Sequence, residues 1–195
     1  MTLYLVRHPA TVWTGVRYVG RRDLDWSAAG RRRADELVAG LGGRLRPTAV
    51  VITSPLRRAH GLARRLADRA CCALEVDERW TEVDVGALEG ATFAELEARD
   101  PLLARRLAAG DLGIDWPAGE RFAELEARVI AAYDDARLRL ERPVVVVSHA
   151  GPIAVLLERF GPSGGVRFIG PGDALAVSET GTGTWSVRPA GIPTR

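Results

Sequence analysis

Two short apolar runs, far apart in the chain, each end beside a histidine. Leu3-Tyr4-Leu5-Val6 leads into Arg7-His8, and Val144-Val145-Val146-Val147 leads into Ser148-His149. Runs of this kind are typical of buried strands in α/β proteins. Ligands of such proteins bind at the carboxyl ends of the strands. Two of the three histidines therefore fall where a site is expected, and the arginine beside the first favours an anionic ligand.

The rest of the chain alternates between strand and helix patterns. Strands are predicted over residues 2–8, 49–53, 72–76, 144–148, 174–178 and 184–188, with a turn over residues 181–183. Helices are predicted over residues 27–41, 54–69, 121–140 and 151–160, and two shorter ones begin at residues 92 and 100. This order predicts an α/β three-layer sandwich with a mostly parallel sheet and helices on both faces.

Four residue pairs or motifs mark the expected helix starts. Ser27 is a predicted N-cap, Ser54-Pro55 supplies an N-cap with proline at the first helical position, Thr92 to Glu95 fits a capping box, and Asp100-Pro101 opens another helix. The helices between roughly residues 91 and 120 interrupt the alternation, which indicates a small insertion over the carboxyl edge of the sheet. No linker or repeat divides the chain, so residues 1–195 are expected to form a single domain.

Composition narrows the functional classes. The chain has no lysine, so all 27 basic residues are arginine, and P-loop, protein-kinase and Schiff-base chemistry are excluded. A net charge of +2 is too mild to indicate nucleic-acid binding, and no membrane-spanning run or signal peptide is recognisable. The adjacent Cys71 and Cys72 imply no disulfide framework, which favours a cytoplasmic protein. The pattern leaves the oligomeric state open.

The residues at the predicted strand ends form a set suited to phosphoryl transfer. Arginines such as Arg7 and Arg58 match phosphate oxygens with a planar fork of donors. A neutral imidazole, at His8 or His149, can attack phosphorus and form a phosphohistidine. A carboxylic acid such as Glu82 can protonate the leaving alkoxide and later take a proton from water. The partner indicated is a small phosphorylated metabolite.

Four segments in chain order resemble the motifs of the histidine phosphatase superfamily, which includes the cofactor-dependent phosphoglycerate mutases. They are Arg7-His8-Pro9-Ala10-Thr11, Ser54-Pro55-Leu56-Arg57-Arg58-Ala59, Glu82 to Gly90, and Val146-Val147-Ser148-His149-Ala150. The resemblance implies that His8 is the nucleophile, that Arg7, Arg58 and His149 hold the phosphoryl group, and that Glu82 exchanges the proton. It implies neither a metal nor a cofactor.

The chain departs from the family pattern at three positions. Pro9 and Ala150 stand where the family has glycine after each histidine, and Thr14 stands where it often has an asparagine on the phosphate. The hydroxyl of Thr14 can still contact the substrate, and Arg21 in the early loop can reach its non-reacting part. Asp84 and Glu89 are the competitors of Glu82 for the acid role, and Glu89 is alternatively a residue that orders the loop.

Three functions stay open. A phosphatase is favoured over a phosphoglycerate mutase because Phe93 stands where the family's mutases carry a lysine, and because the mutases have a longer tail. The Arg-His-Pro opening and short length resemble the α-ribazole phosphatase branch, whose substrate is α-ribazole 5'-phosphate. A non-catalytic phosphate-binding regulatory module is the alternative of another class, and a nucleic-acid binder lacks an aromatic-interleaved basic patch.

Overall fold

A computed structural model describes residues 2–160, 168–181 and 184–190 of the chain. Within these residues six strands form one sheet in the order β3-β2-β4-β1-β5-β6. Neighbours among β3, β2, β4 and β1 pair in parallel, and β5 and β6 add an antiparallel edge. This arrangement confirms the mostly parallel sheet. The strands are β1 (Leu3–Arg7), β2 (Val50–Thr53), β3 (Ala73–Val76), β4 (Val144–Ser148), β5 (Ala174–Gly181) and β6 (Thr184–Pro189).

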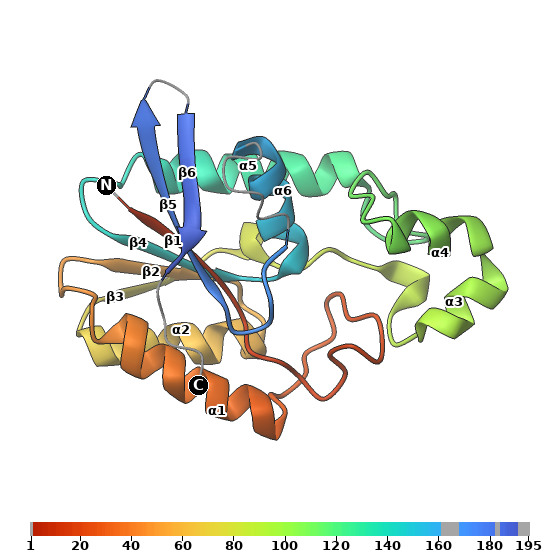
Figure 1. Cartoon of the computed structure of the whole chain (residues 1–195), viewed down its shortest axis with the longest axis horizontal. Coiled ribbons are helices and arrows are strands. Elements are labelled where there is room, and N and C mark those ends of the chain that lie inside the picture. Colours follow the sequence, from red (N-terminus) through yellow and green to blue (C-terminus); the bar gives the residue numbers. More distant parts are fainter. Residues whose placement is uncertain (1, 161–167, 182–183, 191–195) are drawn as a thin grey trace.

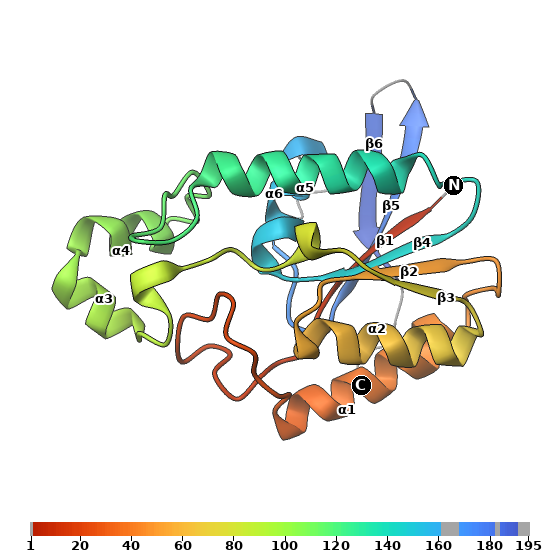
Figure 2. The same cartoon turned by 180° about the vertical axis from the view of Figure 1, so that it is seen from behind.

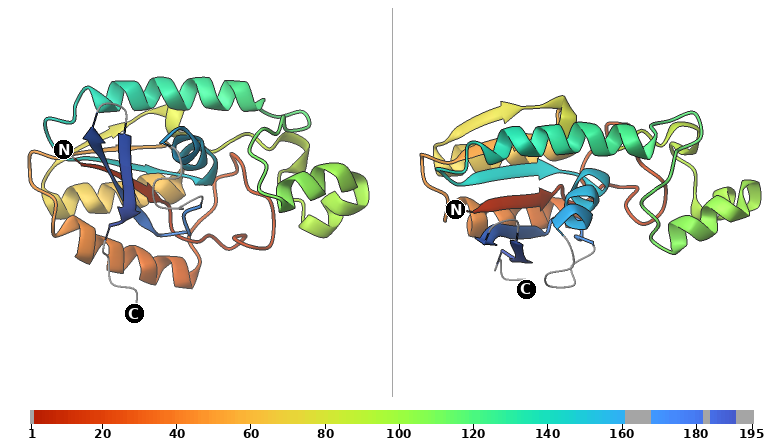
Figure 3. Two further views of the ribbon diagram at one scale, coloured as in Figure 1. Left: turned by 45° about the horizontal axis from the view of Figure 1, so that its top comes forward. Right: turned by 90° about the horizontal axis from the view of Figure 1, so that it is seen from above.

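Helices cover both faces of the sheet, as the three-layer prediction requires (Figures 1 and 3). On one face lie α1 (Ala28–Leu37) and α2 (Arg57–Ala70), and on the other lie α5 (Phe122–Arg137) and α6 (Ala150–Phe160). Successive strand side chains alternate between these faces. In β4, Val144 and Val146 join the core under α5 and α6, whereas Val145 and Val147 join the core under α1 and α2. A central parallel strand therefore has to be apolar throughout.

Two shorter helices, α3 (Phe93–Arg99) and α4 (Pro101–Ala108), complete the insertion. They project from the end of the molecule toward which β1 and β4 point, on the same side as the long loop that follows β1 (Figures 1 and 2). Short turns of other helix types cover Val38–Gly42, Glu78–Trp80 and Gly86–Leu88. None of the described helices is both long enough and apolar enough to cross a membrane.

Most predicted helix starts are confirmed. Ser27 caps α1 by accepting from the Gly30 amide, Thr92 and Glu95 form the capping box of α3, and Asp100 caps α4. The first helix is shorter than predicted, because its α-helical part ends at Leu37 and a π-helical turn follows. The predicted turn over residues 181–183 includes residues 182–183, which lie outside the described residues.

The predicted start of α2 is wrong. The helix begins at Arg57, after an extended Leu56, rather than at Pro55. The amide of Arg57 donates to the carboxylate of Asp23, 34 residues earlier, so a distant loop supplies the cap. The Ser54 hydroxyl does not cap the helix as predicted. It accepts from the Leu56 amide and bonds to His149.

Candidate active site

The two strand-end histidines lie side by side. Arg7 at the end of β1 is in register with Ser148 at the end of β4, and the His8 amide donates to the Ser148 carbonyl at 3.0 Å. The rings of His8 and His149 are 4.9 Å apart between centroids and tilted by 58°. Both side chains are buried. Parallel pairing of two distant strands is thus what joins the two histidines.

The partners of His8 leave it one neutral tautomer. Nδ1 lies 2.7 Å from the carbonyl oxygen of Pro9, which can only accept, so Nδ1 carries the proton. On the other side the Nε of Arg58 donates to Nε2 at 3.3 Å, which requires a lone pair there. Burial, with smaller contributions from the charges of Arg58 and Arg7, lowers the pKa of His8 to about 3. At neutral pH the ring is therefore uncharged, and Nε2 carries a lone pair.

His149 is held by a hydroxyl rather than by a carbonyl. Its Nε2 lies 2.8 Å from Oγ of Ser54, and that oxygen already accepts from the Leu56 amide. The buried Nδ1 has no hydrogen-bond partner among the residues that the structure describes. Burial, followed by the effects of His8 and Arg58, lowers the pKa of His149 well below its ordinary value. When the Ser54 hydroxyl donates to Nε2, Nδ1 becomes a donor beside His8.

Glu82 is a buried carboxyl that faces the first turn of α6. Its Oε1 accepts from the amides of Val83 at 3.0 Å and Gly151 at 2.9 Å, and its Oε2 accepts from the amide of Ala150 at 3.1 Å. A side chain at Gly151 would place Cβ 2.6 Å from Oε1, so glycine is needed there. Ala150, unlike Gly151, carries a side chain and still donates its amide to Glu82. Burial raises the pKa of Glu82 against the opposing effects of the Val83 amide and of Arg58 and Arg7, which favours a carboxyl that carries a proton.

Two arginines complete the cluster. Arg58 is buried, and besides His8 it donates to the carbonyls of Arg22 and Gly20, both at 2.7 Å. Arg7 donates to the carbonyl of Ile169 at 2.9 Å, and its buried Nε has no partner within the described part of the chain. Burial lowers the pKa of each guanidinium, and the charge of Glu82 opposes this. The structure thus brings together Arg7, His8, Arg58, Glu82 and His149.

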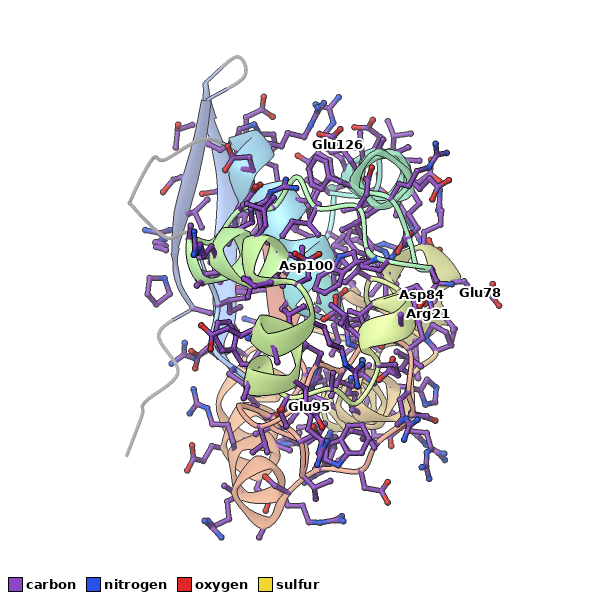
Figure 4. The ribbon with its side chains drawn as sticks, turned by 90° about the vertical axis from the view of Figure 1, so that its right-hand side faces the viewer. Arg21, Glu78, Asp84, Glu95, Asp100 and Glu126 are labelled. Atoms are coloured by element: carbon purple, nitrogen blue, oxygen red, sulfur yellow. The ribbon has the colours of Figure 1, made fainter. Side chains whose placement is uncertain are left out.

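The other two predicted substrate contacts, Thr14 and Arg21, lie outside this hydrogen-bonded cluster. The Thr14 hydroxyl accepts from the amide of Thr11 at 2.8 Å and lies 3.2 Å from the Thr11 hydroxyl. Arg21 is 48% exposed, and its guanidinium lies 3.5 Å from Glu120 and 3.9 Å from Asp84. Figure 4, which looks onto this end of the molecule, places Arg21 beside Asp84. Thr14 closes a turn. Arg21 belongs, with Asp84 and Glu120, to a group of charged residues at the edge of the cluster, which we call the rim.

Sequence reasoning missed a buried ion pair beneath the Glu82 segment. Arg128 of α5 contacts the carboxylate of Glu120 through Nε at 2.6 Å and Nη2 at 2.9 Å. The same guanidinium donates to the carbonyls of Arg79, Thr81 and Glu82. A signal exists in the sequence, because Arg128 falls within the apolar helical pattern of Leu125 and Val129. An arginine on a buried helix face indicates a partner.

Among the described residues, no group of three or more histidine, cysteine, aspartate or glutamate side chains gathers as metal ligands do. The cluster instead offers a neutral imidazole nitrogen, a protonatable carboxyl and two guanidiniums. Such groups can transfer a phosphoryl group through a covalent intermediate.

Comparison with known proteins agrees with this chemistry. The model of the histidine phosphatase superfamily (branch 1) matches residues 3–185. The probable phosphoglycerate mutase GpmB of Yersinia enterocolitica is 33% identical over 165 residues, which are 81% of this chain and 74% of that protein. The structure of mycobacterial glucosyl-3-phosphoglycerate phosphatase with VO3 superimposes with a TM-score of 0.81 at 26% identity, over 97% of both chains.

A further relative is longer than this chain. The bifunctional protein Rv2228c of Mycobacterium tuberculosis is 38% identical over 158 residues, which are 80% of this chain and 43% of that protein. This chain therefore spans less than half the length of that relative.

Proposed function

Because the chain belongs to the histidine phosphatase superfamily, we propose that it is a metal-independent phosphomonoesterase acting through a phosphohistidine on His8. The observation that carries the proposal is the state of His8. The Pro9 carbonyl holds the proton on Nδ1, and Nε2 keeps its lone pair beside Arg58, His149 and Glu82. A nucleophile in this form needs no base to activate it.

In the first step, Nε2 of His8 attacks phosphorus and the ester P–O bond breaks. The leaving alkoxide takes the proton of Glu82, whose burial favours the protonated form before substrate reacts. Arg7, Arg58 and the Nδ1–H of His149 stabilise the charge on the phosphoryl oxygens. Once the N–P bond exists, the Nε–H of Arg58 loses its acceptor on His8 and turns to a phosphoryl oxygen.

In the second step, water replaces the departed alcohol. The Glu82 carboxylate takes a proton from the water as its oxygen attacks phosphorus, and the P–N bond breaks with its electron pair returning to Nε2. The products are inorganic phosphate and neutral His8, and Glu82 is again protonated. One carboxyl therefore serves as acid and then as base.

The charges at the rim favour water, rather than a second hydroxyl of the substrate, as the acceptor of the phosphoryl group. A mutase has to retain a bisphosphate while it turns, which calls for cations free to hold the second anionic group. Arg21 is paired with Glu120 and Asp84, and Arg17 lies 4.0 Å from Glu95. Phe93 supplies no charge. The similarity to GpmB keeps phosphoglycerate mutation as the second candidate.

The proposed substrate is a small phosphorylated metabolite. α-Ribazole 5'-phosphate is one candidate, on the Arg7-His8-Pro9 opening. Glucosyl-3-phosphoglycerate is another, on the likeness to the mycobacterial phosphatase. A non-catalytic phosphate-binding module would use the same arginines without turnover.

The test is hydrolysis of p-nitrophenyl phosphate in EDTA by the parent, His8→Ala and His60→Ala. The parent and His60→Ala, which alters the third histidine, are expected to turn over, and His8→Ala is expected to fall to background. Labelled substrate should leave an acid-labile, alkali-stable phosphoryl group on the parent and none on His8→Ala. Activity that survives in His8→Ala, or that needs added metal, contradicts the proposal.

Two companion assays separate the alternatives. Conversion of 3-phosphoglycerate to 2-phosphoglycerate in the presence of the bisphosphate, faster than release of free phosphate, would establish the mutase. Binding of vanadate without hydrolysis of any tested ester would establish the non-catalytic module.

A further inference from the structure

One carboxylate oxygen holds a whole turn beside the cluster. Oε2 of Glu89 accepts from the successive amides of Gly20 at 3.1 Å, Arg21 at 3.0 Å and Arg22 at 3.4 Å. Consecutive amides that converge in this way form a nest, which binds anions. Oε1 of Glu89 is buried and has no partner in the described part of the chain. The carboxylate is thus held mainly through the turn at residues 20–22.

The same turn is pressed against the Glu82 segment. A Cβ at Gly20 would lie 2.6 Å from the carbonyl oxygen of Val83 and 2.8 Å from the amide nitrogen of Val85. These are backbone atoms, so the turn has no room to shift toward them. Glu89 therefore holds the turn at residues 20–22 on one side. On another side the backbone of Val83 and Val85 leaves the turn no room to move.

The carbonyl groups of the same turn hold the buried Arg58. The carbonyls at Gly20 and Arg22 accept from Nη2 and Nη1 of Arg58, each at 2.7 Å. Two anchors on one turn set the plane of the guanidinium, and its Nε–H then meets Nε2 of His8. A continuous chain of hydrogen bonds thus runs from Glu89 through the turn and Arg58 to His8.

We propose that Glu89 is a positioning residue for phosphoryl transfer, which acts by holding the turn at residues 20–22 so that Arg58 is aligned with Nε2 of His8. The inference rests on the proposed function, because it assigns Glu89 a part in that reaction. Glu89 itself donates no proton to the substrate. Its negative charge matters because three amides and one guanidinium depend on it.

Glu89→Gln is the test variant, and Glu126→Gln is the control, since Glu126 is exposed on α5. Supporting-residue losses cost about 10- to 100-fold, so kcat/KM of Glu89→Gln is expected to fall by that factor. The fall should be equal for p-nitrophenyl phosphate and for an alkyl phosphate. A larger fall on the alkyl ester would mean that Glu89 protonates the leaving group, and would overturn the proposal.

A double-mutant cycle tests whether Glu89 acts through Arg58. In an Arg58→Lys background no guanidinium fork is left to align, so adding Glu89→Gln should cost less than about threefold. Full additivity of the two substitutions would overturn the proposal, as would a single-variant loss below about threefold.

Hydrogen exchange reads the turn directly. The amides of residues 20–22 should exchange slowly in the parent and faster in Glu89→Gln, while those of β4 stay unchanged. If Glu89→Gln does not fold, the parent decides, because unprotected amides at residues 20–22 would overturn the proposal. Hydrolysis by the parent that His8→Ala abolishes, combined with an unchanged Glu89→Gln, would leave the proposed function standing and remove this inference alone.

Discussion

Two regions at the same end of the molecule are built differently. In the cluster, His8, His149, Glu82 and Arg58 are buried and held by hydrogen bonds to backbone or hydroxyl groups. At the rim, Val12 and Val16 are each 61% exposed and Phe93 is 44% exposed. The rim arginines are themselves exposed: Arg17 lies 4.0 Å from Glu95, and Arg21 lies 3.9 Å from Asp84 and 3.5 Å from the buried Glu120.

Under the proposed function, this difference assigns the chemistry to the cluster and the choice of substrate to the rim. A buried polar group that loses its partner is costly, so the cluster tolerates little change. An exposed ion pair or apolar side chain contributes little to stability, so the rim can vary with the substrate. Substitutions in the cluster should therefore have large effects on every ester, whereas rim substitutions should have small effects that depend on the leaving group.

The largest effect is expected for Glu82→Gln. In the proposed mechanism this variant cannot protonate the alkoxide, and general acid catalysis contributes about 10²- to 10⁴-fold, so kcat/KM on an alkyl phosphate should fall by that factor. The fall on p-nitrophenyl phosphate should be smaller, because nitrophenolate leaves without a proton. Stopped-flow absorbance should show a burst of nitrophenolate followed by slow turnover, since Glu82 is also the base for the second step.

The sequence alone leaves Asp84 and Glu89 as competitors of Glu82 for the acid role, and a variant of each gives a control. An equal loss on both esters in Glu82→Gln, together with an alkyl-selective loss in Asp84→Asn or Glu89→Gln, would move the acid to that residue. Glu82 would then only hold the cluster in place, and the leaving alkoxide would take its proton from Asp84 or Glu89.

The second-largest effect is expected on the stability of the fold, at the ion pair between Arg128 and Glu120. Arg128 and Glu120 are 17% and 7% exposed, and Arg128 also donates to three carbonyls of the segment that carries Glu82. Removing Arg128 leaves the buried Glu120 with only the exposed Arg21 at 3.5 Å and takes a donor from three carbonyls, so Arg128→Met should lower the free energy of unfolding by about 3 kcal/mol. Urea denaturation followed by circular dichroism measures this.

The control exchanges the same residue type at the surface. Arg121 pairs with Glu124 on the exposed start of α5, and Arg121→Met should leave the unfolding free energy close to that of the parent. Similar losses in the two variants would erase the distinction between buried and rim charges.

The positions of the two histidines could be predicted because they depend on local patterns. Apolar runs give strands, and parallel pairing aligns their carboxyl ends, so His8 and His149 meet. The fold class follows from the same alternation. The start of α2 could not be predicted, because Asp23 caps it across 34 residues of sequence. The Arg128–Glu120 pair depends on the packing of α5 against the Glu82 segment, which one sequence does not specify.

Thr14 and Glu89 also show that contacts within loops cannot be predicted from a sequence motif. The place of Thr14 in a motif predicts a substrate contact, and in the structure its hydroxyl accepts from the amide of Thr11 and closes a turn. Glu89 is one of two residue assignments that the motif leaves open, and in the structure its carboxylate binds the amides of residues 20–22 and so orders a loop. A motif fixes which residue types occur, whereas loop geometry decides which groups they meet.

The third effect is a dependence of stability on pH. His8 has an ordinary pKa of 6.5 and a pKa of about 3 in the fold, so between these values the unfolded chain binds more protons. The free energy of unfolding therefore falls as pH falls from 6.5 toward 3, and His149 acts in the same direction. Each histidine contributes a slope of at most about 1.4 kcal/mol per pH unit. The raised pKa of Glu82 has the opposite sign.

Comparison of parent and His8→Asn isolates this effect, because both retain His149 and Glu82. Thermal or urea unfolding between pH 4 and pH 6.5 should show a shallower loss of stability in His8→Asn. Equal slopes in parent and His8→Asn would mean that His8 is solvated rather than buried, and the sharp division between cluster and rim would fail.

The smallest effect is expected at Phe93, where the loop after β1 meets the segment after Glu82. Tyr18 exchanges backbone hydrogen bonds with Ala91 and Gly90 there, and Phe93 lines a surface hollow of about 190 Å³ with Val16 and Tyr18. The apolar surface favours an apolar leaving group. Phe93→Ala should raise KM for an aryl phosphate by a few fold, since one apolar contact is worth about 1 kcal/mol, and should leave glycerol phosphate unchanged. Leu102→Ala, which alters a 69% exposed residue on α4, should change neither KM. An equal rise for both esters would place Phe93 with the cluster, because only a change in the shared phosphoryl contacts affects every ester alike.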